Sequence, residues 1–279
     1  MKNLFVVAPL VFGKGLGDPT RLGRAWLAFA VFCALSGAVY ALNDVVDVEK
    51  DRAHPVKKRR PIAAGALPIG LARGFALAFA AFGLVGAAAL DYRFAAVAAG
   101  YLFLNLAYTF VLKHQPFLDV GSIAVGFLLR VLGGAYAVNL APSRWLMLNT
   151  LLLAAFLGFG KRAHELGQAL STKGSIGTTR RVLSKYKVQH LGWALKVTGV
   201  LTSIGYVAYT QAPHTVEFFH TRLFALTAPC CVFGIWRFTT LAMRLDQDDS
   251  PTDGMLRDLP FIANLVVWAL AVLVIIYVV

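Results

Sequence analysis

One amide and four carboxylates, three of them aspartates, are concentrated in the segment NDVVDVEKD at residues 43–51. Asn43, Asp47 and Asp51 are four residues apart, so on a helix they share one face, with a rise of about 6 Å per step. Mg²⁺ prefers oxygen ligands, keeps several waters and bridges protein carboxylates to substrate phosphates. The segment therefore predicts a Mg²⁺ site formed by the catalytic residues Asp44, Asp47 and Asp51 with Asn43, and not an ordinary charged loop.

A strongly basic run, RAHPVKKRRPIAAG, follows directly at residues 52–65. Basic side chains at such a position anchor a membrane protein, and part of the run has that role. Arg and Lys also hold the phosphate oxygens that a metal leaves unpaired. We expect Lys57 and Arg60 to contact a diphosphate substrate and Lys58 and Arg59 to be solvated.

The elements that must position these residues are apolar. Of 279 residues 58% are hydrophobic and 15% charged, whereas a soluble domain has roughly 45–50% and 25%. Stretches of about 20 apolar residues predict membrane-spanning helices. Eight such stretches lie at residues 25–42, 70–90, 93–112, 117–138, 145–160, 190–210, 221–243 and 258–279. A ninth, at 4–12, is too short to span the bilayer, and we do not interpret it as a removable signal peptide.

The net charge of +13 does not indicate nucleic-acid binding, because basic residues are concentrated in two loops, 46–69 and 161–189, which hold 13 of the 27 Lys and Arg residues. Such loops are typically cytoplasmic, which places the acidic segment at the cytoplasmic face. With nine helices the N-terminus would be inside and the C-terminus outside. No linker divides the chain, so residues 1–279 are expected to form one all-α transmembrane domain. Three cysteines lie in apolar stretches and are interpreted as packing residues.

NDVVDVEKD followed by RPIAAGALP resembles the first signature of the UbiA superfamily of intramembrane prenyltransferases. The segment YTFVLKH, residues 108–114, resembles that family's Tyr-x-x-x-x-Lys segment and marks Tyr108, Lys113 and His114 as substrate-binding. The resemblance covers nearly the whole chain. It implies a bundle of about nine transmembrane helices around a central cavity, with a cytoplasmic cap that carries the polar motifs.

The second Asp-rich motif of that family is absent, and GKRAHEL stands in its place at residues 160–166. Lys161 and Glu165 share a helix face, and Arg162 nearly shares it with Glu165. These residues are either a structural ion pair at the membrane edge or a phosphate clamp held by its own carboxylate. Together with LKHQPFLDV, GFLLRVLGG and LRDLPF, the motif resembles the polyprenyl-phosphate phosphoribosyltransferase branch of the superfamily.

Three further polar positions lie in or beside apolar stretches. Arg130 is within 117–138, where a charge is costly, so we expect it to face a cavity near the lipid phosphate. Asp119 is about 16 Å away along a helix, too far for direct contact. Asp119 itself is either a helix cap or a functional residue. Asn105 and Tyr108 are either packing residues or part of the functional site.

The resemblance implies Mg²⁺-dependent transfer of 5-phosphoribose from phosphoribosyl diphosphate (PRPP) to a polyprenyl phosphate such as decaprenyl phosphate, with release of diphosphate. One alternative is a prenyltransferase that attaches a polyprenyl chain to an aromatic acceptor. Another is a transporter or structural membrane protein, which would not explain the acidic and basic segments. The expected location is the cytoplasmic membrane, as a multi-pass protein with its active site facing the cytoplasm. A homo-oligomer is compatible with the sequence, and lipid length and pathway stay open.

Overall fold

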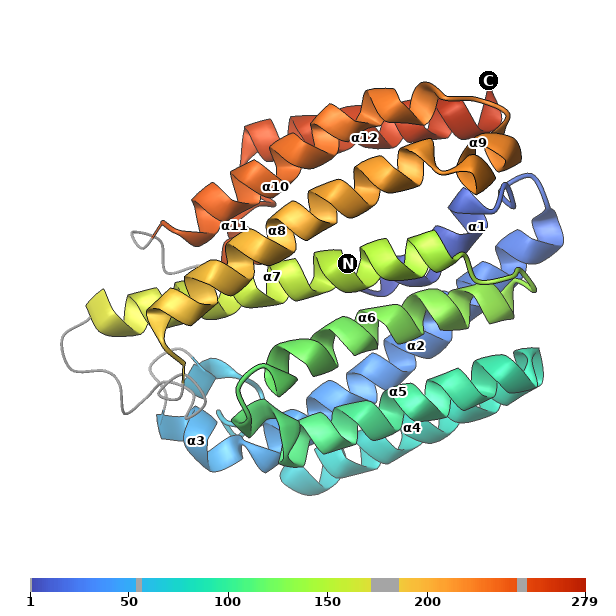
Figure 1. The fold of residues 1–279 in the computed structure, drawn as a ribbon. Coiled ribbons are helices and arrows are strands. Elements are labelled where there is room, and N and C mark those ends of the chain that lie inside the picture. Colours follow the sequence, from blue (N-terminus) through green and yellow to red (C-terminus); the bar gives the residue numbers. More distant parts are fainter. Residues whose placement is uncertain (1, 54–56, 172–185, 245–249) are drawn as a thin grey trace. The chain divides into compact units, whose positions relative to one another are not determined.

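The structure, a computed structural model, describes residues 2–53, 57–171, 186–244 and 250–279 (Figure 1). Every regular element within these residues is a helix, which confirms the all-α class. Seven helices among them are long and apolar enough to cross a membrane. These are α2 (Pro19–Val46), α4 (Ile69–Leu90), α6 (Leu118–Ala137), α7 (Arg144–Ser171), α8 (Val188–Gln211), η5 (Leu223–Thr227) continued by α10 (Ala228–Ala242), and α12 (Leu259–Tyr277).

Two predicted spans are not among these seven. The stretch 93–112 forms α5 (Tyr92–Phe110), which is long enough but carries Arg93, Asn105 and several tyrosines. The stretch 4–12 forms η1 (Lys2–Val6) and α1 (Ala8–Phe12), which together are too short, as expected. The count of nine spans is therefore not confirmed, and it stays a prediction together with the cytoplasmic cap.

The helices group into two compact units, which we describe separately; the single domain stays a prediction. The first unit comprises Met1–Lys113 and Val125–Pro142 and contains η1, α1, α2, α3 (Val48–Ala53), η2 (Lys57–Arg59), α4, α5 and most of α6. Its core gathers the rings of Phe32, Phe94 and Tyr101 around Val6. Gly134 of α6 lies so close to the Val6 carbonyl that a Cβ would collide with it. This approach packs the short N-terminal segment against the long helices.

The second unit comprises His114–Ala124 and Ser143–Val279. It contains α7, α8, α9 (Pro213–Phe219), η5, α10, α11 (Pro251–Gly254) and α12, and Phe156, Leu195 and Phe238 lie in its core. The predicted end of a helix at residue 160 is wrong, because α7 continues to Ser171. Residues 161–170 are mostly good helix formers, and Leu166 and Ala169 are buried. The segment GKRAHEL is thus helical, and the rest of the predicted basic loop, 172–185, lies outside the described residues.

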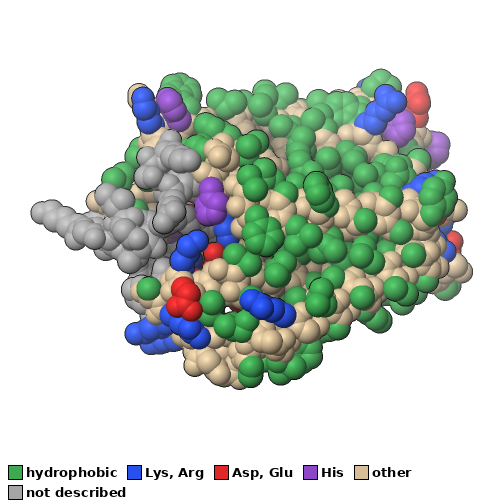
Figure 2. Space-filling view, turned by 90° about the horizontal axis from the view of Figure 1, so that it is seen from below, with side chains coloured by type: hydrophobic (Ala, Val, Ile, Leu, Met, Phe, Trp, Pro, Cys, Tyr) green, Lys and Arg blue, Asp and Glu red, His purple; other side chains and the backbone are tan. Residues whose placement is uncertain are grey.

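Large apolar side chains cover much of the surface. On α4, for example, Leu77, Phe82 and Val85 are 74%, 65% and 69% exposed. On the face shown in Figure 2, hydrophobic side chains fill the broad middle and charged side chains lie near its edges. Extended exposed apolar surface is unfavourable in water but natural in lipid. With the seven apolar helices, this surface indicates a multi-pass membrane protein.

Candidate active site

The acidic segment lies where α2 ends and α3 begins. Asp47 is the residue after α2, and its backbone N–H donates to the Asn43 carbonyl at 2.9 Å. The Asp51 N–H donates to the Asp47 carbonyl at the same distance. Helical hydrogen bonding thus continues through the junction, so the four-residue spacing expected from the sequence is present. Asn43, Asp47 and Asp51 project from one turn to the next at the end of a membrane helix.

Arg60 binds two of the three aspartates. Its Nη1 donates to Asp44 Oδ1 at 2.6 Å and to Asp51 Oδ2 at 2.9 Å. The Asp51 side chain is only 6% exposed, whereas that of Arg60 is 40% exposed. A buried carboxylate needs a partner for its charge. The guanidinium supplies that partner from a partly exposed position.

Lys113 binds the other half of the segment. Its Nζ lies 2.8 Å and 3.0 Å from the two carboxylate oxygens of Asp47 and 3.4 Å from Asn43 Oδ1. Lys50 adds a longer contact to Asp47, at 3.5 Å. Burial raises the pKa of Asp47, but the hydrogen bonds and charges of Lys113 and Lys50 outweigh burial and hold the pKa below its usual value. Asp47 is therefore ionised at neutral pH, as a metal ligand must be.

The donor set fits Mg²⁺. All four side chains offer oxygen atoms, and they form two pairs, Asp44 with Asp51 and Asn43 with Asp47, each gathered on one cationic group. Within the described part of the chain no three His, Cys, Asp or Glu side chains converge as a ready-made metal cluster. Mg²⁺ in phosphate-handling enzymes uses one or two carboxylates together with waters and phosphate oxygens. Either pair meets that requirement, with the cationic side chain standing where a metal would neutralise the charge.

The remaining residues predicted for this region lie on short elements or helix ends. Lys57 is in η2, Tyr108 is near the end of α5, and His114 ends η3 (Leu112–His114); all three are partly buried. Lys58 and Arg59 are exposed, as expected. The roles of Lys57, Tyr108 and His114 in binding stay predictions.

Arg130 is 5% exposed in the first unit and is held by neutral groups. Its Nε donates to Asn3 Oδ1 at 2.9 Å, Nη1 to the Gly126 carbonyl at 2.9 Å, and Nη2 to Tyr101 Oη at 2.7 Å. The guanidinium also lies 4.7 Å from the Tyr101 ring centroid. No carboxylate pairs with Arg130 in the described residues. Its contact with a lipid phosphate stays a prediction, and the structure adds a second task, fixing the N-terminal segment through Asn3.

Arg162 occupies a buried cluster in the second unit. Its side chain is 1% exposed, pairs with Glu165 through Nη1, and faces Asp119 Oδ2 through Nε at 3.4 Å. Of the two helix-face pairings considered, Arg162–Glu165 is the one present in the structure. Asp119, 0% exposed, also accepts a 2.6 Å hydrogen bond from the Tyr186 hydroxyl. Sequence reasoning missed Tyr186, whose contact spans 67 residues and leaves no local pattern.

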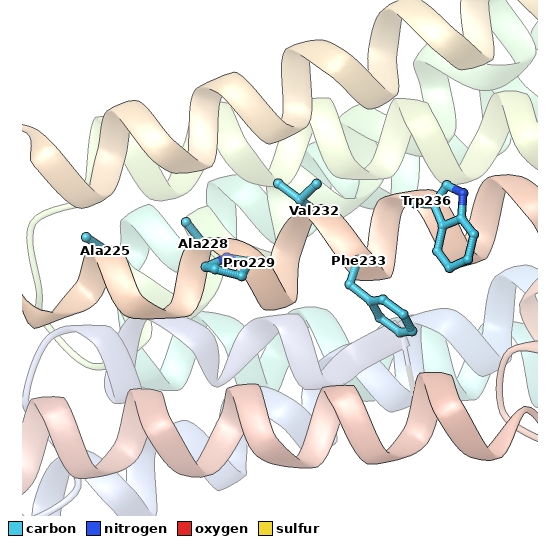
Figure 3. A pocket seen from close by; sticks show the side chains of 6 residues that line it. All are labelled: Ala225, Ala228, Pro229, Val232, Phe233 and Trp236. Carbon is cyan, nitrogen blue, oxygen red and sulfur yellow. The ribbon is translucent and has the colours of Figure 1, made fainter.

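A cavity of about 620 Å³ lies elsewhere in the second unit, along η5 and α10 (Figure 3). Its lining residues are Ala225, Ala228, Pro229, Val232, Phe233 and Trp236. The lining contains no titratable side chain, so this cavity offers nothing to hold a diphosphate or a metal. It suits the apolar surroundings of a membrane helix.

Comparisons with known proteins agree with this arrangement. Residues 4–171 match the model of the UbiA prenyltransferase family. The chain is 36% identical over 76% of its length to the decaprenyl-phosphate phosphoribosyltransferase of Mycolicibacterium smegmatis, and 35% identical over 81% to that of Mycobacterium tuberculosis. These matches span 67% and 76% of the two relatives. A solved structure of a UbiA homolog from Archaeoglobus fulgidus bound to DMAPP and Mg²⁺ covers 100% of this chain and 96% of its own, with a TM-score of 0.74 at 17% identity.

Proposed function

The chain belongs to the UbiA prenyltransferase family, and we propose that it transfers 5-phosphoribose from PRPP to a polyprenyl phosphate at the cytoplasmic face of the cell membrane. The relatives named decaprenyl-phosphate phosphoribosyltransferase support this choice within the family. The observation that carries it is the presence of two unlike polar regions. One is an oxygen-rich segment bound by Arg60 and Lys113, and the other is a helix that reads Lys161-Arg162 where the family resemblance leads us to expect aspartates.

In the proposed reaction an oxygen of the lipid phosphate attacks C1 of the ribose. The bond from C1 to the diphosphate oxygen breaks, and diphosphate leaves with the electron pair, so C1 inverts. The acceptor is already an anion, and no strong general base is required. Catalysis then rests on positioning and on stabilising the charge of the leaving group.

Mg²⁺ bound by Asp44, Asp47 and Asp51, with Asn43 assisting, would neutralise the charge of the leaving diphosphate. Arg60 and Lys113 are proposed to move from the carboxylates to the phosphate oxygens, since a metal relieves them of their present partners. Lys57 adds a further positive charge close by in η2. On α7, Lys161 is the proposed phosphate contact, because Arg162 is already engaged by two carboxylates.

The test uses the full chain purified in detergent, with labelled PRPP and decaprenyl phosphate. We expect a labelled lipid product in the presence of Mg²⁺ and none after its removal by a chelator. The matched arm supplies a polyprenyl diphosphate and an aromatic acid to the same preparation. Product in that arm alone would assign the chain to prenyl transfer and refute the phosphoribosyl proposal.

A further inference from the structure

Among the described residues, the buried cluster of the second unit contains two carboxylates and one guanidinium. Asp119 and Glu165 share one guanidinium, that of Arg162. No other cationic side chain is paired with either carboxylate in the ranges that the structure describes. Carboxylates that share one guanidinium keep lone pairs that can accept further hydrogen bonds.

The two ends of this cluster differ in exposure. Arg162 and Asp119 are 1% and 0% exposed, whereas the Glu165 side chain is 25% exposed. One oxygen of Glu165, Oε2, faces Arg162. The pair with Arg162 does not use Oε1, the second oxygen of this carboxylate. Glu165 is therefore the member of the cluster that a ligand can reach, and a carboxylate only accepts hydrogen bonds.

A chain of contacts fixes the buried end. The Phe117 backbone N–H, just before α6, donates to the Tyr186 hydroxyl at 2.5 Å, and that hydroxyl donates to Asp119 Oδ1 at 2.6 Å. A hydroxyl has one proton to donate. Because the amide is itself a donor, that proton goes to Asp119. Asp119 Oδ2 then faces Arg162 with no other partner among the described residues. These contacts run from Tyr186 through Arg162 to Glu165, and each one restricts the position of the next side chain.

We propose that Glu165 accepts hydrogen bonds from the ribose hydroxyls of PRPP, and that Tyr186, Asp119 and Arg162 are positioning residues that hold it for this contact. The inference rests on the proposed function. Of the groups in the two proposed substrates, only the ribose hydroxyls are donors, since diphosphate and lipid phosphate oxygens are acceptors. A carboxylate that binds ribose hydroxyls is also an established mode of nucleotide recognition. Glu165 thus selects a sugar donor over a prenyl donor, which has no hydroxyl to offer.

The test separates sugar recognition from phosphate recognition. For Glu165→Gln we expect the KM for PRPP to rise about tenfold with little change in kcat, because an ionic hydrogen bond becomes a neutral one. The inhibition constant of inorganic diphosphate, which has no hydroxyls, should stay within about twofold of wild type. Tyr186→Phe should raise the KM for PRPP about three- to tenfold, again without changing diphosphate inhibition. The control is Tyr206→Phe, which removes another buried, hydrogen-bonded hydroxyl of the second unit, and both constants should be unchanged.

The outcomes divide clearly. If the KM of Glu165→Gln stays at the wild-type value, or if diphosphate inhibition weakens in parallel, Glu165 does not read the sugar and this inference is overturned while the proposed function stands. If wild type transfers no phosphoribose, the proposed function fails first and the inference falls with it. Thermal unfolding of each variant in detergent identifies losses that come from misfolding, and Tyr186→Phe keeps the test open if Glu165→Gln does not fold.

Discussion

Two polar regions of this protein hold carboxylates beside basic side chains in different settings. In the first unit three aspartates face Arg60, Lys113 and Lys50. In the second unit Asp119 and Glu165 face one guanidinium among the described residues, that of Arg162. The cations differ in exposure, since the Arg60 side chain is 40% exposed and the Arg162 side chain is 1% exposed. Arg60 is therefore the cation that a metal would replace in the proposed reaction, whereas Arg162 is enclosed.

The sharpest contrast is expected in stability. Arg162→Met would leave two carboxylates without a counter-charge, one of them fully buried, and should lower the free energy of unfolding by about 3–5 kcal/mol. Arg60→Met should cost less, because water reaches Asp44, which is 29% exposed. Denaturation in mixed micelles measures the free energy of unfolding of both variants. Equal losses of unfolding free energy in the two variants would contradict the distinction between a fixed and an exchangeable cation.

The first region should dominate catalysis. Asp47→Asn removes an ionised oxygen ligand, and we expect kcat/KM to fall more than about 100-fold, or about 2.7 kcal/mol, with folding intact. Glu49→Gln is the matched control, since Glu49 lies on the neighbouring helix α3, is 80% exposed and pairs only with Arg52 in the described residues. If Asp47→Asn reduced kcat/KM by less than about tenfold, the effect would be too small for the loss of a metal ligand.

Lys161 tests whether the second region also contributes to phosphate binding. A charge-assisted hydrogen bond is worth roughly 1.5–3 kcal/mol, so Lys161→Ala should reduce kcat/KM about 10- to 150-fold. Lys58→Ala, which removes an exposed lysine, should leave the kinetics unchanged. If Lys161→Ala reduced only the yield of protein and not the kinetics per folded molecule, Lys161 would be a membrane-edge anchor.

The first unit also depends on one tight packing contact away from its charges. Gly134→Ala would drive a methyl group into the Val6 carbonyl, and we expect a loss of about 1–3 kcal/mol in unfolding free energy. Gly100→Ala, on α5 of the same unit, meets no atom within 4 Å and should be neutral or slightly stabilising. Matching effects of the two variants would show that η1 does not pack against α6 as described.

The two regions were unequally readable from the sequence. Asn43, Asp47 and Asp51 follow helical spacing, and Arg60 lies only nine residues beyond Asp51, so local pattern located all of them. Lys113 is 66 residues from Asp47 and was found only through family resemblance. The partnership of Asp119 with Tyr186 and Arg162 arises from tertiary packing, and no periodicity encodes it. The charged residues after 160 favour a loop in the sequence, but lysine, arginine and glutamate are also good helix formers, and α7 continues to Ser171.

The proposed divalent-metal site lies in the first region and not in the second. Mn²⁺, which shares the octahedral oxygen preference of Mg²⁺, can be titrated into the purified full chain and followed by electron paramagnetic resonance. We expect a saturable site in wild type that is retained in Glu165→Gln and lost in Asp47→Asn. A site that survives Asp47→Asn but disappears in Glu165→Gln would assign the metal to the second region and refute the proposed metal site.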